Sequence, residues 1–386
     1  MLVLRQPDTR EKVALLAESA RFDLCGADEA CAAAPSGKRV AEGLAQYLFQ
    51  PAARVSTPLL KVLMTDSCRN DCLYCAFRAG MDRRRTAFEP EELAGAFVEM
   101  YRRGQASGLF LSSGLAGDPV RTMEAMLRTV EILRHRHRFP GYVHLKILPG
   151  ATWGYLEAAC RLADRVSVNL EAPNPSRLAA IAPGKEFHGE LLDSLRRVAA
   201  LRWQPGLLSF GSTTQFVVGA AGESDREILE TVGRLYGEVN LTRAYYSAFR
   251  PLAGTPLEGH PPASPVRQRR LYQADALIRQ YGFSPEEVPL DEAGNLVHSR
   301  DPKLEWALRH PERFPLEVNR ASREDLLRVP GIGPRGAAAL IKARRQGRLP
   351  GPEALRGLPV RLSRAAPFLL VNGRRAGVGV QGILDL

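Results

Sequence analysis

Short apolar runs alternate with longer amphipathic segments between residues 58 and 283. The short runs have the length and the β-branched and aromatic content of strands, whereas the longer segments repeat apolar residues every three or four positions, as helices do. The predicted strands are residues 59–65, 108–113, 142–148, 165–171, 212–218 and 241–249. Strict alternation of strand and helix predicts a parallel sheet with right-handed crossovers. Six such units fit an α/β fold of the partial (β/α)6 barrel type better than a complete eight-fold barrel.

Two further regions flank the predicted barrel. Residues 1–52 form a helical N-terminal segment in this interpretation, and residues 53–285 form the barrel. The stretch 283–303 mixes proline, glycine and acidic residues, as linkers do. Residues 286–386 are therefore predicted to be a linker followed by a small all-α domain.

The composition is that of a soluble globular protein, with 45% hydrophobic and 25% charged residues. No uncharged apolar run reaches the roughly 18 residues that a membrane span needs, and the first residues lack the apolar core of a signal peptide. We therefore expect a cytoplasmic protein without a membrane partner. In that reducing compartment, clustered cysteines indicate metal binding or catalysis more often than disulfides.

The positive charge is concentrated at the end of the chain. The whole sequence carries a formal net charge of +11, and from Arg300 onward seventeen Lys and Arg face eight Asp and Glu. A surplus confined to one small domain favours a polyanionic partner, most simply a nucleic acid.

Three of the six cysteines lie within eight residues, directly after the first predicted strand. Cys68, Cys72 and Cys75 thus follow the carboxyl end of a strand, where α/β barrels place their chemistry. Zinc usually takes four protein ligands, whereas a 4Fe-4S cluster can be held by three thiolates with one iron left open. No further His or Cys lies nearby in sequence, so the cluster is favoured. Buried structural cysteines and a structural zinc site remain as alternatives.

The spacing Cys-x3-Cys-x2-Cys, with Tyr74 before the last cysteine, resembles the signature of the radical S-adenosylmethionine (radical SAM) superfamily. The resemblance implies that the open iron chelates the amino and carboxylate groups of S-adenosylmethionine. It also implies that an electron from the reduced cluster cleaves the sulfonium bond to give a 5'-deoxyadenosyl radical, which abstracts hydrogen from the substrate. The cofactors supply this chemistry, so the protein must position and shield them.

Polar side chains in other predicted strands extend the cofactor site. Ser167, Asn169 and Glu171 share one face of their strand, and parallel strands covered by helices seldom carry such a polar row. Gln215 and Lys146 are single polar residues in otherwise apolar strands, and each fits a satisfied core polar group equally well.

The second predicted strand ends in a short turn of small residues. Radical SAM enzymes usually have a glycine-containing turn here that binds the methionine amino group, although Leu115 stands where the family has an acid. A glycine motif at 217–225 resembles the one that packs near adenine. The cofactor-binding residues that the resemblance implies are Tyr74, Ser112, Ser113, Gly114, Asn169, Glu171 and Gln215.

Residues 319–349 contain a second motif. The pattern predicts one helix over 321–329, a turn over 330–335 and another helix over 336–346. The apolar residues that fall where these two helices must pack are Leu326, Leu327, Ile332, Leu340 and Ile341. The glycines permit a tight turn close to a phosphate, and the second helix offers free N–H groups at its amino terminus. The stretch resembles a helix-hairpin-helix, and a weaker second copy follows at 352–369, where Pro359 stands in the turn. The predicted hairpin and phosphate contacts are Gly331, Ile332, Gly333, Arg335, Lys342 and Arg344.

Phosphate contacts of this kind give affinity without reading base sequence. A protein–protein module is the alternative, since such hairpins sometimes bind partners.

Together with residues 171–185 and 244–257, these motifs resemble a family of radical SAM proteins assigned to DNA modification or repair. That family ends in a helix-hairpin-helix and is often paired in genomes with a uracil-DNA-glycosylase-like protein. The resemblance implies an enzyme that uses a 4Fe-4S cluster and S-adenosylmethionine to act on DNA. It also implies such a glycosylase-like partner, and an electron donor such as flavodoxin or ferredoxin. Radical SAM modification of RNA such as tRNA, and a non-catalytic iron–sulfur DNA binder that senses redox state, are the alternatives.

The other cysteines are interpreted as ordinary thiols. Cys25 and Cys31 precede the barrel, and two cysteines make an incomplete cluster site. Cys160 falls on the apolar side of a predicted helix, where free cysteine behaves as a small hydrophobic residue.

Overall fold

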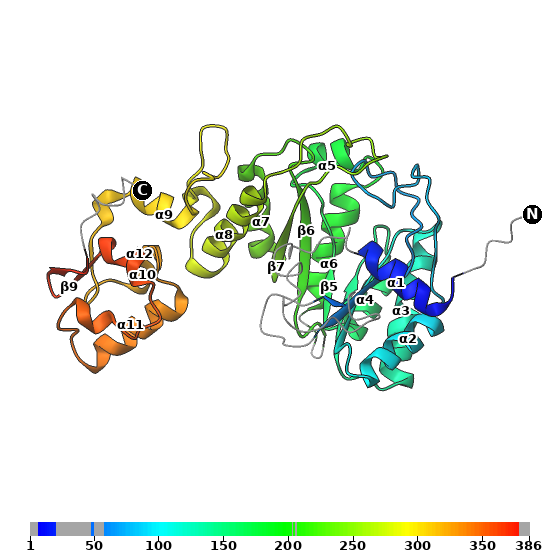
Figure 1. Ribbon diagram of the computed structural model, residues 1–386, viewed down its shortest axis with the longest axis horizontal. Helices are drawn as coiled ribbons and strands as arrows, with labels where there is room; N and C mark the ends of the chain where they lie inside the picture. Colours follow the sequence, from blue (N-terminus) through cyan, green and yellow to red (C-terminus); the bar gives the residue numbers. More distant parts are fainter. Residues whose placement is uncertain (1–6, 21–47, 50–57, 203, 205–206, 378–386) are drawn as a thin grey trace, which may run out of the picture. The chain divides into compact units, whose positions relative to one another are not determined.

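The computed structural model describes residues 7–20, 48–49, 58–202, 204 and 207–377. The chain packs as two compact units, described separately below (Figure 1). Unit 1 contains the residues up to Glu223 together with Arg234–Ser264, and unit 2 contains Ser224–Gly233 and the chain from Pro265 onward. The domain boundaries expected from the sequence remain predictions.

Unit 1 is built on a sheet whose strands follow one another in chain order. The strands are β1 (Leu48–Phe49), β2 (Leu59–Leu63), β3 (Gly108–Ser112), β4 (Tyr142–Lys146), β5 (Arg165–Ser167), β6 (Ser212–Val218) and β7 (Arg243–Ala248). Strands β2 to β7 pair in parallel, and the short β1 adds an antiparallel strand at the edge beside β2. The six parallel strands form a curled half barrel, which confirms the predicted (β/α)6 architecture.

Helices connect the parallel strands, as the sequence pattern predicts. They are α2 (Pro90–Arg102), α3 (Pro119–Glu131) with its π-helical extension η3 (Ile132–Arg136), α4 (Trp153–Leu162), α5 (Pro175–Ile181), η4 (Phe187–Leu192), α6 (Asp193–Leu201) and α7 (Asp225–Glu238). An additional helix, α1 (Thr9–Ser19), precedes the sheet. No helix in the described part of the chain is long and apolar enough to cross a membrane.

The two faces of the parallel sheet differ in polarity. Val62, Leu111 and Val166 are fully buried on one face, and the Thr129 hydroxyl of α3 lies 3.7 Å from Sδ of Met64 on the same side. Side chains alternate along a strand, so Ser167 of β5 and Thr213 and Gln215 of β6 fall on the opposite face. This alternation separates the helix-packed core from the polar face.

Strand β5 is shorter than the sequence predicts because its ladder is interrupted. The hydroxyl of Thr214 accepts the N–H of Leu170 at 3.1 Å, in place of a backbone carbonyl. Pairing with β6 resumes at Glu171, which forms an isolated bridge with Phe216. The chain thus follows the sheet to Glu171 before it turns away.

Unit 2 is mainly helical. Its helices are α8 (Pro265–Tyr281), α9 (Pro302–Arg309), α10 (Arg323–Arg328), α11 (Pro334–Gln346) and α12 (Leu362–Ala365). A three-stranded sheet of β8 (Leu316–Glu317), β9 (Leu369–Val371) and β10 (Arg374–Arg375) was not predicted. Strands of two or three residues are too short to show the alternation by which a strand is recognised in sequence.

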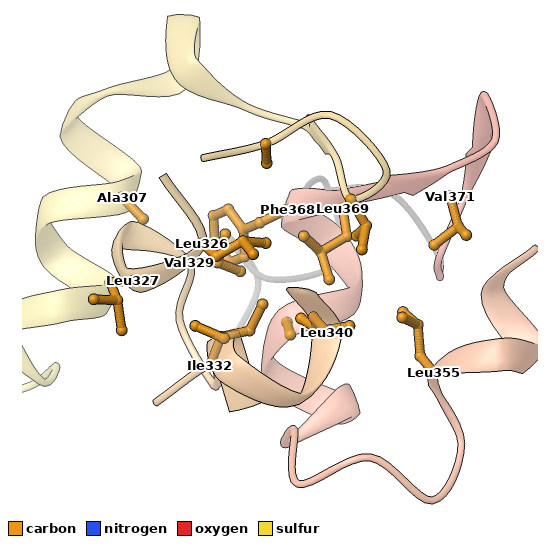
Figure 2. Close-up of a cluster of buried hydrophobic side chains, with 14 of the residues drawn as sticks. Ala307, Leu326, Leu327, Val329, Ile332, Leu340, Leu355, Phe368, Leu369 and Val371 are labelled. Atoms are coloured by element: carbon orange, nitrogen blue, oxygen red, sulfur yellow. The ribbon is translucent and has the colours of Figure 1, made fainter. Parts of the chain in front are cut away.

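One apolar cluster joins the elements of unit 2 (Figure 2). Leu326 and Leu327 of α10 pack with Ile332 of the following turn and Leu340 of α11, as their spacing predicts. The same cluster includes Phe368, so the chain after α12 returns to this core. The turn between α10 and α11 is therefore anchored from within.

The core of unit 2 also contains a buried lysine. Lys303 is 8% exposed, and its Nζ donates to the carbonyl oxygen of Ile332 at 2.5 Å. Its ammonium group lies 4.5 Å from the ring centroid of Tyr281. Burial, and then the charge of Arg328, lower the pKa of Lys303 from its ordinary 10.5 to about 7.

This lysine predicts a pH dependence of stability. Between pH 7 and 10.5 the unfolded chain binds a proton at residue 303 that the folded chain has largely released, so the free energy of unfolding rises with pH in that window. The slope approaches about 1.4 kcal/mol per pH unit for one proton. Denaturant titrations from pH 7 to 9 should show this slope in the wild type relative to Lys303→Met. Parallel curves for the two proteins would contradict it.

Candidate active site

The loop that carries the three cysteines follows β2 and is turned by backbone hydrogen bonds. Cys75 N donates to Cys72 O at 3.1 Å, and Arg69 N donates to the carbonyl of Leu115 after β3 at 2.7 Å. Cys72 is buried, whereas Cys68 and Cys75 are half-buried. Thiols from one short loop are thus held beside the ends of β2 and β3.

The donor set fits a cluster better than a single ion. Among the described residues, no three His, Cys, Asp or Glu side chains converge closely enough to hold one metal ion. A 4Fe-4S cluster does not require such convergence, because each thiolate binds a different iron. Cys68, Cys72 and Cys75 can serve as its ligands.

The protonation state of the thiols depends on whether a metal cation is bound to them. Burial raises the pKa of Cys72, and burial with the neighbouring Cys72 raises the pKa of Cys75 to about 12. Without a cation the protein therefore favours neutral thiols. Bound iron reverses this preference, because a coordinating thiol is deprotonated outright.

Arg85 closes the cysteine loop by binding its backbone. Its Nη1 donates to the carbonyl oxygens of Asp66 at 2.6 Å and Phe77 at 3.0 Å, and its Nη2 donates to those of Arg78 at 2.8 Å and Met81 at 3.2 Å. The four carbonyls flank the three cysteines on both sides. One guanidinium therefore fixes both ends of the loop.

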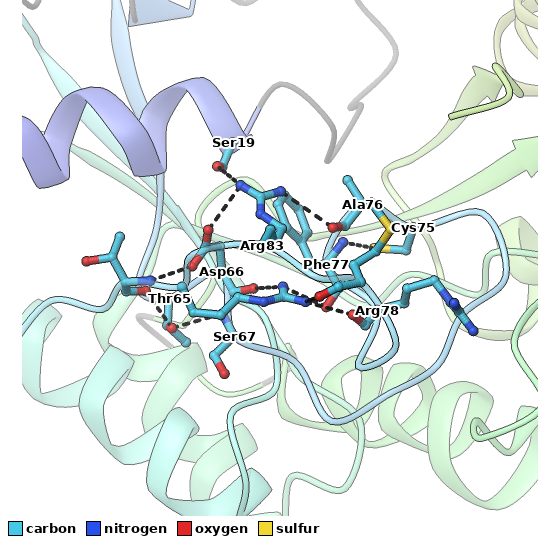
Figure 3. A network of polar contacts seen from close by, with 12 residues as sticks. Ser19, Thr65, Asp66, Ser67, Cys75, Ala76, Phe77, Arg78 and Arg83 are labelled. Carbon is cyan, nitrogen blue, oxygen red and sulfur yellow. Dashed lines mark hydrogen bonds and ion pairs between the residues drawn. The ribbon is translucent and has the colours of Figure 1, made fainter. Parts of the chain in front are cut away.

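A second arginine connects the loop to α1 (Figure 3). Arg83 Nη2 lies 3.1 Å from the carboxylate of Asp66 and 3.3 Å from Ser19 Oγ at the end of α1. The other carboxylate oxygen of Asp66 accepts the N–H of Thr86 at 2.8 Å. The helix before the sheet is thereby tied to the frame of the cysteine loop.

Glu171 occupies a strained backbone position beside the cysteines. Its φ is 63°, a left-handed conformation that is rare for a residue with a side chain and costs of order 1–3 kcal/mol. Two ladder bonds hold it there, since its N–H donates to Gln215 O at 2.9 Å and its carbonyl accepts from Val217 N at 2.8 Å. Strain of this kind occurs at functional sites.

The carboxylate of Glu171 contacts both Lys185 and the cysteine loop. It lies 3.0 Å from Nζ of Lys185 and is hydrogen-bonded to the side chain of Tyr74 in the cysteine loop. Burial by itself lowers the pKa of Lys185, but the carboxylate and the nearby thiols more than offset this and raise it. Burial, then Glu171, raise the pKa of Tyr74. At neutral pH a lysine cation and a neutral phenol thus lie beside the cysteines.

The turn after β3 also contacts the loop. Gly114 N donates to Thr65 O at 2.7 Å, and a Cβ at this glycine would collide with the carbonyl oxygen of Ser67. The buried hydroxyl of Ser113 has no hydrogen-bond partner in the described part of the chain. Such an unpaired group fits a polar atom supplied by a cofactor.

Two further predicted cofactor residues, Asn169 and Gln215, lie on the polar face of the sheet. Asn169 is 7% exposed and Gln215 is 5% exposed. Within the described residues Oε1 of Gln215 has no partner, and neither has Oγ of Ser167. The structure therefore brings Tyr74, Glu171 and the backbone of Gln215 into one hydrogen-bonded group, and the cofactor contacts of Asn169 and Gln215 stay predictions.

Sequence reasoning missed Arg85 and Lys185. Arg85 is one of three consecutive arginines at 83–85, and nothing in the sequence distinguishes the residue that binds the loop carbonyls. Lys185 ends the segment 171–185, but a pairing across fourteen residues has no local sequence pattern. Cys25 and Cys31 lie outside the described residues. Cys160 is buried in α4, as predicted.

Residues 62–235 match the family model of the Radical SAM superfamily. This segment contains the cysteine loop, most of the parallel sheet, and the group formed by Tyr74, Glu171 and Lys185. The chain therefore contains a radical SAM domain. Members of this superfamily use a 4Fe-4S cluster and S-adenosylmethionine, and the cysteine loop of this domain fits such a cluster.

Two curated proteins are similar to this chain over 218 residues. An uncharacterised protein of Methanocaldococcus jannaschii is 26% identical over 54% of this chain and 52% of its own length. The threonylcarbamoyladenosine tRNA methylthiotransferase MtaB of Thermotoga maritima is 24% identical over 54% of this chain and 48% of its own length. The matched region spans about half the length of each relative.

Two solved structures are also similar. The FeFe-hydrogenase maturase HydG from Carboxydothermus hydrogenoformans aligns with a TM-score of 0.46 and 14% identity, over 57% of this chain and 51% of that chain. Methylornithine synthase (PylB) aligns with a TM-score of 0.46 and 14% identity, over 56% of this chain and 60% of that chain.

When bound, the cluster and S-adenosylmethionine supply reductive cleavage and hydrogen abstraction. The residues of this chain supply position and charge. Arg85 holds the ligand loop, Ser113 offers a hydroxyl, and Lys185 places a cation beside the thiolates. Keeping Tyr74 protonated leaves its hydroxyl as a hydrogen-bond donor to Glu171.

The Arg85 contacts predict how firmly the cluster is held. Replacing Arg85 by Met removes four hydrogen bonds to loop carbonyls, so the anaerobically reconstituted protein should lose iron to a chelator several-fold faster than the wild type. Loss of the visible absorbance of the cluster measures this rate. Arg103→Met, at an exposed ion pair with Glu99, is the matched control and should behave as wild type. Equal rates for all three proteins would contradict the proposed clamp.

The buried ion pair predicts a coupled effect on stability. Lys185→Met leaves the carboxylate of Glu171 buried and unpaired, which costs about 3–5 kcal/mol. Adding Glu171→Gln should recover part of this loss, because the unpaired charge is then gone. Chemical denaturation of the apoprotein measures both steps. If the double variant is less stable by the sum of the two single effects, the pair is not coupled.

Proposed function

We propose that this radical SAM enzyme acts on DNA in repair or modification, and that the α10–turn–α11 segment of unit 2 is a helix-hairpin-helix that holds DNA by its phosphates. The observation that carries the proposal is the turn itself. Gly331 has φ of 85°, and a Cβ there would lie 2.6 Å from Arg361 O. Only glycine allows this tight turn against its neighbour.

The amino terminus of α11 provides the phosphate-binding groups in this proposal. Pro334 occupies the first turn, and the N–H groups at the start of a helix have no partner within it. Together with the helix dipole, these groups favour an anion. Arg335 and Lys342 are exposed on the same helix and can add contacts to the backbone of the polymer.

Arg344 has a different environment. Its Nη1 donates to the carbonyls of Val318 at 2.8 Å and Ala321 at 2.6 Å, so it stabilises the unit. The proposal does not depend on a phosphate contact from Arg344, which stays a prediction. The second hairpin copy has the four-residue helix α12, and Val360 forms a bridge with Ile332. In this interpretation the second copy packs against the first hairpin and stabilises its turn.

RNA is the second candidate substrate, because the similar protein from Thermotoga maritima is named as a tRNA methylthiotransferase. DNA is preferred here because phosphate contacts from a hairpin suit a regular duplex backbone. The proposal includes an electron donor such as flavodoxin or ferredoxin, and a uracil-DNA-glycosylase-like partner. A non-catalytic redox sensor is disfavoured, since residues 62–235 match the model of a superfamily of enzymes.

Product analysis tests this function. The full chain, reconstituted and reduced without oxygen, should release 5'-deoxyadenosine, and duplex DNA should stimulate release more than tRNA. Cys72→Ala should abolish the product, and Arg335→Ala with Lys342→Ala should weaken DNA binding at low salt without changing DNA-independent release.

Stronger stimulation by tRNA would move the substrate to RNA. No affinity of the full chain for either polymer would overturn the nucleic-acid proposal while leaving the radical SAM assignment in place.

A further inference from the structure

Three buried side chains on the polar face of the sheet carry an atom without a hydrogen-bond partner. Oγ of Ser167, Oγ1 of Thr213 and Oε1 of Gln215 bond to nothing in the part of the chain that the structure describes. The three residues are 5%, 0% and 5% exposed, so bulk water does not satisfy them either. Buried polar groups in proteins almost always have a partner. These atoms therefore indicate that a polar ligand binds on this face.

The three side chains form one group. Ser167 of β5 pairs in register with Thr213 of β6, so their side chains are neighbours on the same face. Gln215 follows two positions along β6 and lies on that face too. Roughly 4.8 Å separates the two strands, and roughly 6.6 Å separates Thr213 from Gln215 along β6. A group of this extent suits a ligand of several atoms better than one water molecule.

Stability does not account for the hydroxyl of Thr213. The residue is completely buried, and a hydroxyl taken out of water without a hydrogen bond lowers the stability of the folded chain. Valine has nearly the same shape and would avoid this loss. A hydroxyl retained at such a position fits a role in binding.

The basic residues beside the group do not require an anionic ligand. Lys146 is the neighbour of Ser167 across the sheet, and Arg243 is the neighbour of Thr213. Each of the two basic side chains also takes part in another interaction. The unpaired atoms are themselves neutral, and placing a charge against them away from water is unfavourable. A neutral ligand with several polar atoms is therefore favoured over a phosphate.

A nucleobase has the chemistry that this group would recognise. Its edge carries both hydrogen-bond donors and acceptors, which an amide oxygen and two hydroxyls can pair. Tyr245 is the neighbour of Gln215 in register, and the guanidinium carbon of Arg243 lies 5.1 Å from the centroid of its ring. Aromatic rings and guanidinium planes are the groups on which unstacked bases lie.

The group lies on the amino-terminal side of the cysteine edge. Glu171, beside the cysteines, forms a bridge with Phe216, which is three residues beyond Thr213 on β6. Three residues of a strand correspond to about 10 Å. A ligand held by Thr213 is thus on the strands that lead to the expected cofactor position.

Enzymes that act on a base of duplex DNA turn it out of the stack to reach it. We propose that Ser167, Thr213 and Gln215 bind the polar edge of a nucleobase that has been turned out of the DNA. This inference rests on the proposed function and names the part of the polymer that the half barrel receives. Gln215, which the family resemblance assigns to the cofactor, is assigned to the substrate here.

The test measures binding of the four deoxynucleosides to the full chain, reconstituted with its cluster, in excess S-adenosylmethionine and without a reductant. The cofactor site is then filled and no turnover occurs. Titrations followed by saturation-transfer NMR should show that at least one nucleoside binds and that deoxyribose does not. Thr213→Val should bind that nucleoside about ten-fold more weakly, the effect of one hydrogen bond lost to a buried partner.

Thr214→Val is the matched control, since Thr214 is the next residue of β6 and lies on the opposite face. Its hydroxyl accepts the N–H of Leu170 at 3.1 Å. The control should bind nucleosides as the wild type does, but its apoprotein should unfold at a temperature about 2–4 °C lower, because the N–H loses its partner. The Thr213→Val apoprotein should be at least as stable as the wild type.

The inference is overturned if the wild type binds no nucleoside, if deoxyribose binds as tightly, or if Thr213→Val keeps the wild-type affinity. Weaker binding by Thr213→Val together with a lowered unfolding temperature would mean a structural role and would also overturn it. The proposed function is tested separately, by DNA binding and by DNA-stimulated release of 5'-deoxyadenosine. A protein that shows both but binds no nucleoside keeps that function and loses this inference alone.

Discussion

Parallel strand pairing is the constraint on which the arrangement of the site depends. Because strands β2 to β7 run in one direction, their carboxyl ends meet at one edge of the sheet. The cysteine loop after β2, the turn after β3 and the bend at Glu171 after β5 are therefore neighbours although they are far apart in sequence. The backbone hydrogen bonds of Glu171 to Gln215 and Val217 extend the parallel pairing with β6 beyond the end of β5.

Local interactions then convert this edge into a site. Arg85 binds four carbonyls around the cysteines, and the ion pair of Glu171 with Lys185 places opposite charges where the thiols are buried. In unit 2 the same device occurs in a different form, since buried Lys303 also binds a backbone carbonyl. In both units a basic side chain bound to backbone oxygens fixes a loop.

The sequence predicted the strands and the helices because these follow from periodicity, and the cysteine ligands, assigned from their spacing, stay a prediction. It also predicted that Leu326, Leu327 and Leu340 pack together, since their spacing places them on facing sides of two helices. It did not predict β8 to β10, which are too short to show a period. The pairing of Lys185 with Glu171 and the contacts of Arg85 were also missed, because they depend on how distant segments meet.

The Arg85 clamp has a consequence for how this site tolerates change. The guanidinium recognises main-chain oxygens, which every type of amino acid supplies equally. Side chains between Asp66 and Met81 other than the cysteines and Tyr74 can therefore be exchanged while the backbone contacts of Arg85 are kept. Such a frame would allow the surroundings of the cluster to be adapted to new substrates, by evolution or by design, without rebuilding the part that holds the metal.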